Sequence, residues 1–207
     1  MTFAAVLSDL DGVLVDSGAA VERVWREWAA SQTLDADEVV RAMHGVPAAQ
    51  VIERVAPQLN PVSEGERVDR LHAATGGTAL PGAAELLAHV SPLAVVTSCS
   101  SSLAAARFAA AGLAPSEVLI TSDRTERGKP HPDPYLAAAS ALGVSAADCL
   151  VVEDAPAGVE AGLAAGAEVW AVSTTHAPDE LSAATVVVRD LWAVLDRLGL
   201  RRPTAAG

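Results

Sequence analysis

Two aspartates, Asp9 and Asp11, directly follow an apolar run at residues 4–8. A short, continuously apolar run is typical of a strand buried on both faces, and ligands of open α/β sheets bind at the carboxyl ends of such strands. The two carboxylates are therefore expected to reach one site. Gly12 allows the tight turn that follows and leaves room for a phosphate group. A solvated acidic turn is the alternative for this motif taken alone.

A hydroxyl pair and a lysine could bind the phosphate oxygens. Thr97 and Ser98 end the apolar run at residues 93–97, where a hydroxyl and the N–H groups of a new helix suit a phosphate oxygen. A helix N-cap among neighbouring serines is the alternative. Lys129 is the only lysine of the chain, and it lies in the stretch 128–134, which contains three prolines. Those prolines stiffen the loop, so that it can hold one ammonium group in place.

A further acidic pair, Glu153 and Asp154, follows the apolar run at residues 149–152. Together with Asp9, these carboxylates would bind a hard cation through oxygen, and Mg²⁺ prefers such ligands while it keeps several waters. One more acidic loop is the alternative for this pair alone. All four clusters follow or neighbour a strand end, so they are expected to converge on one edge of the sheet. Three acids, a hydroxyl and a lysine at that edge are suited to phosphoryl transfer.

The elements that must position these residues alternate between strand and helix. Helical stretches are expected at residues 102–111, ending at Gly112, and at 157–165. Another helix is expected to begin at Asp133 as N-cap and to end at Gly143. This order predicts an α/β fold with a doubly wound parallel sheet. Its expected strands are residues 4–8, 93–97, 118–120, 149–152, 169–172 and 185–188.

One segment interrupts the alternation. Residues 17–80 contain no convincing strand, and four apolar side chains near their start recur at the spacing of one helix face. These are Val21, Val24, Trp25 and Trp28. The glycine-rich residues 75–78 indicate a linker back to the sheet. We therefore expect a core of residues 1–15 and 81–207 and an inserted helical domain at 16–80.

Composition limits the classes of partner. The chain has 207 residues, 51% of them hydrophobic, and a formal charge of −12, which disfavours binding to nucleic acid or to an anionic membrane surface. No segment offers the ~20 uncharged apolar residues that span a bilayer, and the N-terminus lacks the basic region of a signal peptide. Cys99 and Cys149 are expected to be reduced and buried, so a cytoplasmic location is expected. The expected assembly is a monomer or weak oligomer.

The four motifs together resemble those of the haloacid dehalogenase-like hydrolases, in the subgroup that carries a helical cap after the first strand. The resemblance covers essentially the whole chain. The stretches GKPHPDPY and LVVEDAPAGVEAGLAAG are most similar to those of the sugar-phosphate and glycerol-phosphate phosphatases related to 2-deoxyglucose-6-phosphatase. The resemblance implies a Rossmann-like core and a phosphatase acting on a small sugar or polyol phosphate.

The resemblance also implies roles. Asp9 would be the nucleophile that forms an aspartyl-phosphate, and Asp11 would protonate the leaving alkoxide and then deprotonate water. Thr97 and Lys129 would hold the phosphoryl oxygens, helped by backbone N–H groups near Asp11, near Gly12 and near Ser98. The implied cofactor is Mg²⁺, bound by Asp9, the Asp11 carbonyl and Asp154, with Glu153 supporting these ligands without binding the ion, or reaching it through a water.

Several other classes of enzyme fit these residues less well than a phosphatase does. A dehalogenase has no use for Asp11 because its leaving group is halide, and a phosphonatase needs a second lysine beside Lys129. A P-loop requires Ser or Thr where Pro130 stands. The closest rival is a β-phosphoglucomutase-like sugar phosphomutase. Such mutases usually carry a histidine four residues after the Ser17 position, where this chain has Val21.

The helical segment departs from the related phosphatases, which often carry arginine where Pro47 stands. His44 is expected either to face the substrate or to be structural. Two non-enzyme alternatives are a receiver-like signalling protein and a phosphate-binding protein. A receiver has its phosphoaccepting aspartate after the third strand and lacks the helical insertion, and a binding protein on this fold would have lost a motif residue. None is lost here.

Overall fold

A parallel sheet forms the centre of the computed structural model, which describes residues 3–43 and 46–200. The strand order is β5-β4-β1-β6-β7-β8, and each neighbouring pair is parallel. The predicted doubly wound parallel sheet is therefore confirmed. The strands are β1 (Ala5–Ser8), β4 (Leu93–Val96), β5 (Val118–Ile120), β6 (Cys149–Glu153), β7 (Glu168–Val172) and β8 (Val186–Val188).

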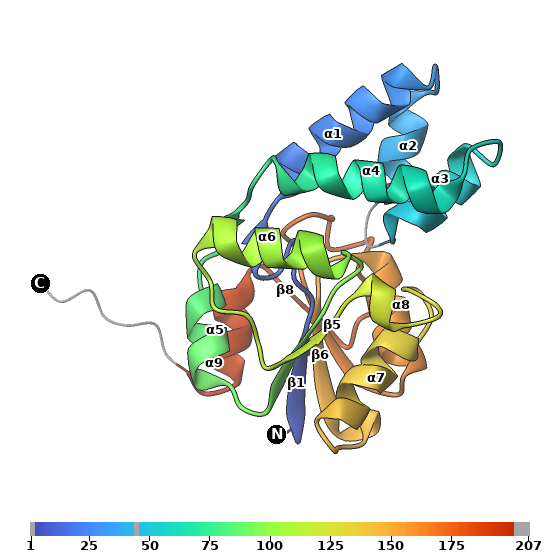
Figure 1. Ribbon diagram of the computed structural model, residues 1–207. Coiled ribbons are helices and arrows are strands. Elements are labelled where there is room, and N and C mark those ends of the chain that lie inside the picture. Colours follow the sequence, from blue (N-terminus) through green and yellow to red (C-terminus); the bar gives the residue numbers. More distant parts are fainter. Residues whose placement is uncertain (1–2, 44–45, 201–207) are drawn as a thin grey trace, which may run out of the picture.

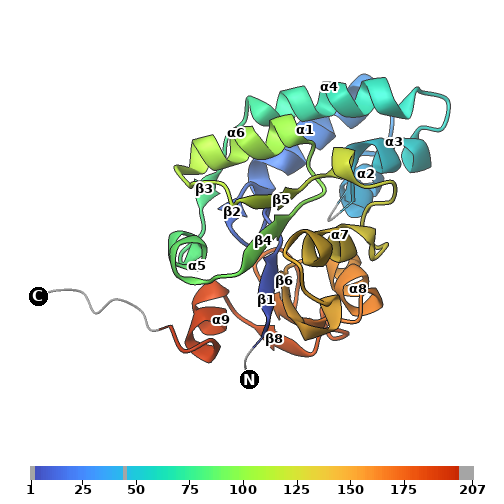
Figure 2. The same ribbon diagram turned by 60° about the horizontal axis from the view of Figure 1, so that its bottom comes forward.

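Helices cover both faces of the sheet (Figure 2). One face packs against α5 (Ala83–His89), α6 (Ser101–Ala111) and α9 (Leu191–Arg197), and the other against α7 (Asp133–Ala141) and α8 (Pro156–Ala164). Side chains of the central strand alternate between the two apolar clusters, because successive strand residues point to opposite faces. Short 3₁₀ turns lie at Ser122–Arg124 and Ala146–Asp148.

Four further helices lie together beyond one edge of the sheet (Figure 1). They are α1 (Gly18–Ser31), α2 (Ala36–Met43), α3 (Ala48–Val55) and α4 (Pro61–Ala73). Their apolar faces meet in a separate cluster that contains Trp25, Trp28 and Ile52. This separate core supports our proposal that residues 16–80 form a helical cap on a core of residues 1–15 and 81–207. Along the described ranges, no helix is both long and apolar enough to cross a membrane.

Two local predictions were wrong. The segment expected to lack strands contains β3 (Thr78–Ala79), which pairs antiparallel with β2 (Val15–Asp16), because the chain enters and leaves the helical segment along adjacent paths. Asp133 is the first residue of α7 rather than its N-cap, which is Pro132. The Asp133 carboxylate is instead held by Arg127, at 2.9 and 3.0 Å. Gly112 ends α6 in the left-handed conformation, as predicted.

Candidate active site

A cavity of about 130 Å³ lies where the carboxyl ends of the strands meet the helices α1–α4. The structure brings most of the predicted site residues together here, although they come from four separate parts of the chain. Lys129 and Glu153 are buried behind the Asp9 carboxylate. His44 lies outside the described residues. The predicted residues that line the cavity are Asp9, Asp11, Gly12, Thr97, Ser98 and Asp154.

The Lys129 ammonium connects the first and last motifs. Its Nζ forms an ion pair with Asp9 Oδ1, lies 2.6 Å from Glu153 Oε1 and donates to the Val96 carbonyl at 3.1 Å. Burial opposes its charge, but Asp9 and Glu153 raise the pKa of Lys129 well above its usual range. Tyr135 Oη also donates to Glu153 Oε1, at 2.7 Å. Lys129 is therefore a permanent cation held against one oxygen of Asp9.

Three buried acids form a candidate metal centre in the described part of the chain. Asp9, Glu153 and Asp154 each offer a carboxylate oxygen within 4.8 Å of the others. Burial raises the pKa of Asp9 to about 8. The Lys129 charge acts to lower this pKa, whereas the Glu153 charge acts to raise it further. Burial, then Glu153 and Asp9, raise the pKa of Asp154 well above its usual range. One lysine does not balance three buried carboxylates, so the donor set fits a divalent cation.

The hydrogen bonds of Glu153 separate it from the other two acids. Its Oε1 accepts from Lys129 and Tyr135, and its Oε2 accepts from the backbone N–H groups of Asp154 and Ala155, at 2.9 and 3.3 Å. Both oxygens are thus already engaged. Glu153 holds the loop and the lysine in position, whereas Asp9 and Asp154 have oxygens available for a cation.

The loop after β7 completes the site, and our interpretation of the sequence missed it. Thr174 Oγ1 donates to the Gly12 carbonyl, and Thr175 Oγ1 donates to Asp154 Oδ2. The available signal was the same as for Thr97, namely hydroxyl residues directly after an apolar strand. Gly12 has φ +81°, and a Cβ there would overlap the Asp154 carboxylate. The absence of a side chain at Gly12 therefore lets the Asp154 carboxylate approach closely, and the predicted role of Gly12 in phosphate binding stays a prediction.

Asp11 is held by three side chains on the other side of the cavity. Ser17 Oγ donates to Oδ1, Cys99 Sγ donates to Oδ2 at 3.0 Å, and Arg107 Nε lies 3.1 Å from Oδ1. Burial raises the pKa of Cys99 well above its usual range, so it remains a thiol. Cys99 is partly rather than fully buried, whereas Cys149 is buried, and both are free. Arg107, the one charged residue of the alanine-rich α6, was not predicted.

Thr97 and Ser98, the residues predicted to bind phosphate, do not cap a helix. The N-cap of α6 is Ser100, and the helix begins at Ser101. Thr97 is 4% exposed, lines the cavity and accepts a hydrogen bond from the backbone N–H of Cys99 at 3.1 Å. The Thr97 hydroxyl therefore lies at the cavity wall, where its O–H group can donate to a ligand.

Known proteins resemble this chain over most of its length. The model of the haloacid dehalogenase-like hydrolases matches residues 3–166. Hexitol phosphatase A of Escherichia coli is 43% identical over 194 residues, which cover 89% of this chain and 90% of that protein. Glycerol-1-phosphate phosphohydrolase 2 of Saccharomyces cerevisiae is 32% identical over 196 residues, which cover 86% of this chain and 77% of that protein. A hydrolase structure from Pseudomonas syringae superimposes with a TM-score of 0.80 at 26% identity, covering 94% of this chain and 97% of that one.

Proposed function

The chain belongs to the haloacid dehalogenase-like hydrolases, and from this membership we propose a Mg²⁺-dependent phosphatase that acts on a small sugar or polyol phosphate. The observation that carries the proposal is the placement of Asp9, with Lys129 on one of its oxygens, in the same cavity as Asp11. Two relatives are named for phosphates of small polyols, which supports that substrate class.

Asp9 is proposed as the nucleophile. A carboxylate oxygen of Asp9 attacks phosphorus, forming the aspartyl-phosphate as the bond from phosphorus to the alcohol oxygen breaks. The attack needs an ionised carboxylate, and Lys129 favours that form against the effect of burial. Lys129 also balances negative charge that collects on the phosphoryl oxygens, and Thr97 donates a hydrogen bond to one of them.

Asp11 is proposed as the general acid and base. It donates a proton to the leaving alcohol oxygen, and its carboxylate then removes a proton from the water that hydrolyses the aspartyl-phosphate. Ser17, Cys99 and Arg107 fix the orientation of this carboxyl group. Held from three directions, it can complete both proton transfers without moving away from the reacting oxygen.

The divalent cation would be held by Asp9, Asp154 and the backbone carbonyl of Asp11. When bound, it supplies positive charge that draws the phosphoryl group toward Asp9 and offsets the repulsion between the acids. Thr175 fixes Asp154 for this task, and Glu153 fixes the loop from behind.

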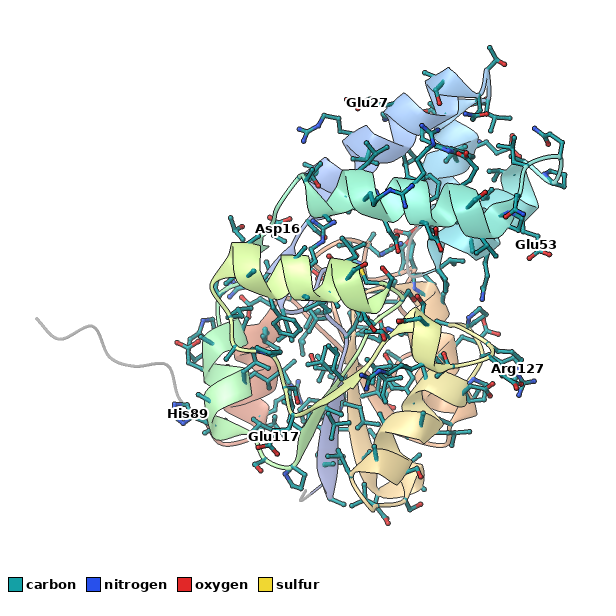
Figure 3. The ribbon with its side chains drawn as sticks, viewed as in Figure 1. Asp16, Glu27, Glu53, His89, Glu117 and Arg127 are labelled. Carbon is teal, nitrogen blue, oxygen red and sulfur yellow. The ribbon has the colours of Figure 1, made fainter. Side chains whose placement is uncertain are left out.

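The test is phosphate release from a panel of sugar, polyol and nucleotide monophosphates, with Mg²⁺ and with EDTA. We expect Mg²⁺-dependent release from one or a few sugar or polyol phosphates. Asp9→Asn should abolish turnover and retain the fold, because the amide is a poor nucleophile of the same shape. The matched control is Asp16→Asn at an exposed position (Figure 3), which should remain active.

Three outcomes would count against the proposal. Substantial activity in Asp9→Asn would overturn the nucleophile assignment. A preference for nucleotides over every sugar phosphate would overturn the substrate class. Interconversion of a sugar phosphate after a bisphosphate primer is added, without release of phosphate, would indicate a mutase.

A further inference from the structure

Arg107 carries hydrogen-bond donors that no described group uses. The side chain is 1% exposed and lines the cavity. Its Nη1 donates to the Gly76 carbonyl, whereas Nε and Nη2 have no hydrogen-bond partner among the described residues, although Nε lies 3.1 Å from Asp11 Oδ1. Each buried N–H donor that lacks an acceptor destabilises the folded protein. A ligand that accepts hydrogen bonds from the Arg107 guanidinium is therefore favoured in this cavity.

His72, on α4, presents a complementary group close enough to Arg107 for the guanidinium charge to act on its ring. It is 4% exposed, lines the same cavity, and its Nε2 has no partner in the described structure. A hydrogen bond to the Val21 backbone occupies the other ring nitrogen. Burial, followed by Arg107, lowers the pKa of His72 to about 4, so the ring is neutral near pH 7. With the proton on the Val21 side, Nε2 is a free acceptor.

A donor and an acceptor together match one chemical group. An alcohol hydroxyl can accept from the Arg107 guanidinium and donate to His72 Nε2. A phosphate or carboxylate oxygen offers no proton to Nε2, and an alkyl carbon satisfies neither. A second anionic group is also disfavoured because the cavity already contains the carboxylates of Asp11 and Asp69. The pair therefore selects an uncharged hydroxyl.

The position of Arg107 indicates which hydroxyl is recognised. Arg107 contacts Asp11, the residue proposed to protonate the leaving oxygen, so it lies on the alcohol side of the bond that breaks. The helices α4 and α6, which carry His72 and Arg107, run side by side (Figure 1, Figure 2), and both residues line the cavity. Apolar side chains of Val21, Trp25 and Met43 complete the wall and suit the C–H groups of a carbon chain.

We infer that Arg107 and His72 form a specificity site that hydrogen-bonds a hydroxyl of the substrate's carbon chain, close to the phosphorylated carbon. This inference rests on the proposed phosphatase function and deepens it. It assigns the preference for polyhydroxy alcohol phosphates to one arginine of the core and one histidine of the helical segment, neither of which belongs to the four sequence motifs.

The test compares substrates that differ only in hydroxyls, namely glycerol 1-phosphate against n-propyl phosphate, and a hexitol phosphate against n-hexyl phosphate. The measured quantity is the ratio of kcat/KM for polyol to alkyl phosphate. His72→Phe and Arg107→Met are each expected to lower this ratio by about tenfold or more, which corresponds to one lost hydrogen bond to a buried group. His72→Gln keeps a polar group and should recover part of the ratio.

His72→Phe carries the decisive result because no hydrogen bond or ion pair joins His72 to Asp11 among the described residues, whereas Arg107→Met also releases the Asp11 carboxyl. The controls are Arg70→Met, an exposed residue on α4, and the exposed His89→Phe (Figure 3); both should keep the wild-type ratio. Equal loss on polyol and alkyl phosphates in folded variants would show a structural role and overturn the inference. If the wild type hydrolyses neither class, the proposed phosphatase function itself fails.

Discussion

Lys129 is the residue on which the buried charges of the site depend. It is 1% exposed and is the cation paired with both Asp9 and Glu153. Removing one partner from a buried ion pair is more costly than the pair itself is stabilising, because the remaining charge stays desolvated. The lysine is therefore expected to matter for folding as well as for phosphate binding.

We expect Lys129→Met to lower the free energy of unfolding by about 3–5 kcal/mol in the metal-free protein at neutral pH. Urea unfolding measures this change. Arg127→Met, on the same loop but 59% exposed in its pair with Asp133, should change the stability far less, because solvent screens an exposed ion pair. Equal stability of the two variants would contradict the described role of Lys129.

His72 predicts a pH dependence of stability. Its pKa is lowered from 6.5 to about 4 by burial and then by Arg107. Between those values the unfolded chain binds a proton at His72 that the folded protein does not. The free energy of unfolding is therefore undiminished by His72 above pH 6.5 and falls as the pH is lowered toward 4. The total loss from His72 is about 3 kcal/mol.

The measurement compares urea unfolding of wild type and His72→Gln at pH 7 and pH 4.5. Because the carboxylates titrate alike in both proteins, the difference between them isolates the effect of His72. The wild type should lose more stability on acidification than the variant. A chemical-shift titration of the His72 ring supplies a direct check, and an ordinary pKa near 6.5 would exclude the mechanism.

At the scale of elements, the contact between β6 and α8 sets the position of Glu153. Gly158 lies in the first turns of α8, and a Cβ there would overlap the Glu153 carboxylate. Helix propensity alone favours Ala over Gly by about 1 kcal/mol. The overlap of a Cβ with the Glu153 carboxylate favours glycine instead, and we expect this effect to outweigh the helix propensity.

Gly158→Ala is therefore expected to destabilise the protein by about 1–3 kcal/mol and to reduce kcat, because displaced Glu153 no longer holds Lys129. Thermal unfolding and the phosphatase assay check both effects. Glu160→Ala, exposed on the same helix, is the control and should be neutral or slightly stabilising. A stabilised, fully active Gly158→Ala would refute the packing argument.

At the scale of the whole molecule, the charge of −12 opposes an anionic substrate. Acidic side chains such as Glu27, Glu53 and Glu117 point outward over different parts of the surface (Figure 3). Screening this field with salt should raise kcat/KM by about twofold or more between about 10 and 150 mM NaCl at saturating Mg²⁺. Replacing the three glutamates by glutamine should weaken the salt dependence, and a fall of kcat/KM with salt would contradict the prediction.

The sequence by itself determined the sheet, the place of the helical segment and the convergence of the four motifs. Each depends on local pattern: apolar runs define parallel strands, and the carboxyl ends of such strands lie at one edge whatever the side-chain packing. The residues just after those runs, Asp9, Thr97 and Asp154, could therefore be assigned to one site from the sequence.

Only the tertiary structure decided which side chains contact these residues. Arg107 and His72 are distant in sequence, and their approach depends on how α6 and α4 pack. The contact of Thr175 with Asp154 and the close approach of the Asp154 carboxylate to Gly12 likewise depend on distances between separate elements. Periodicity describes one element at a time, whereas these contacts arise only when elements pack together. Residue patterns therefore predicted which motif residues lie at one edge of the sheet, but not the side chains that surround them.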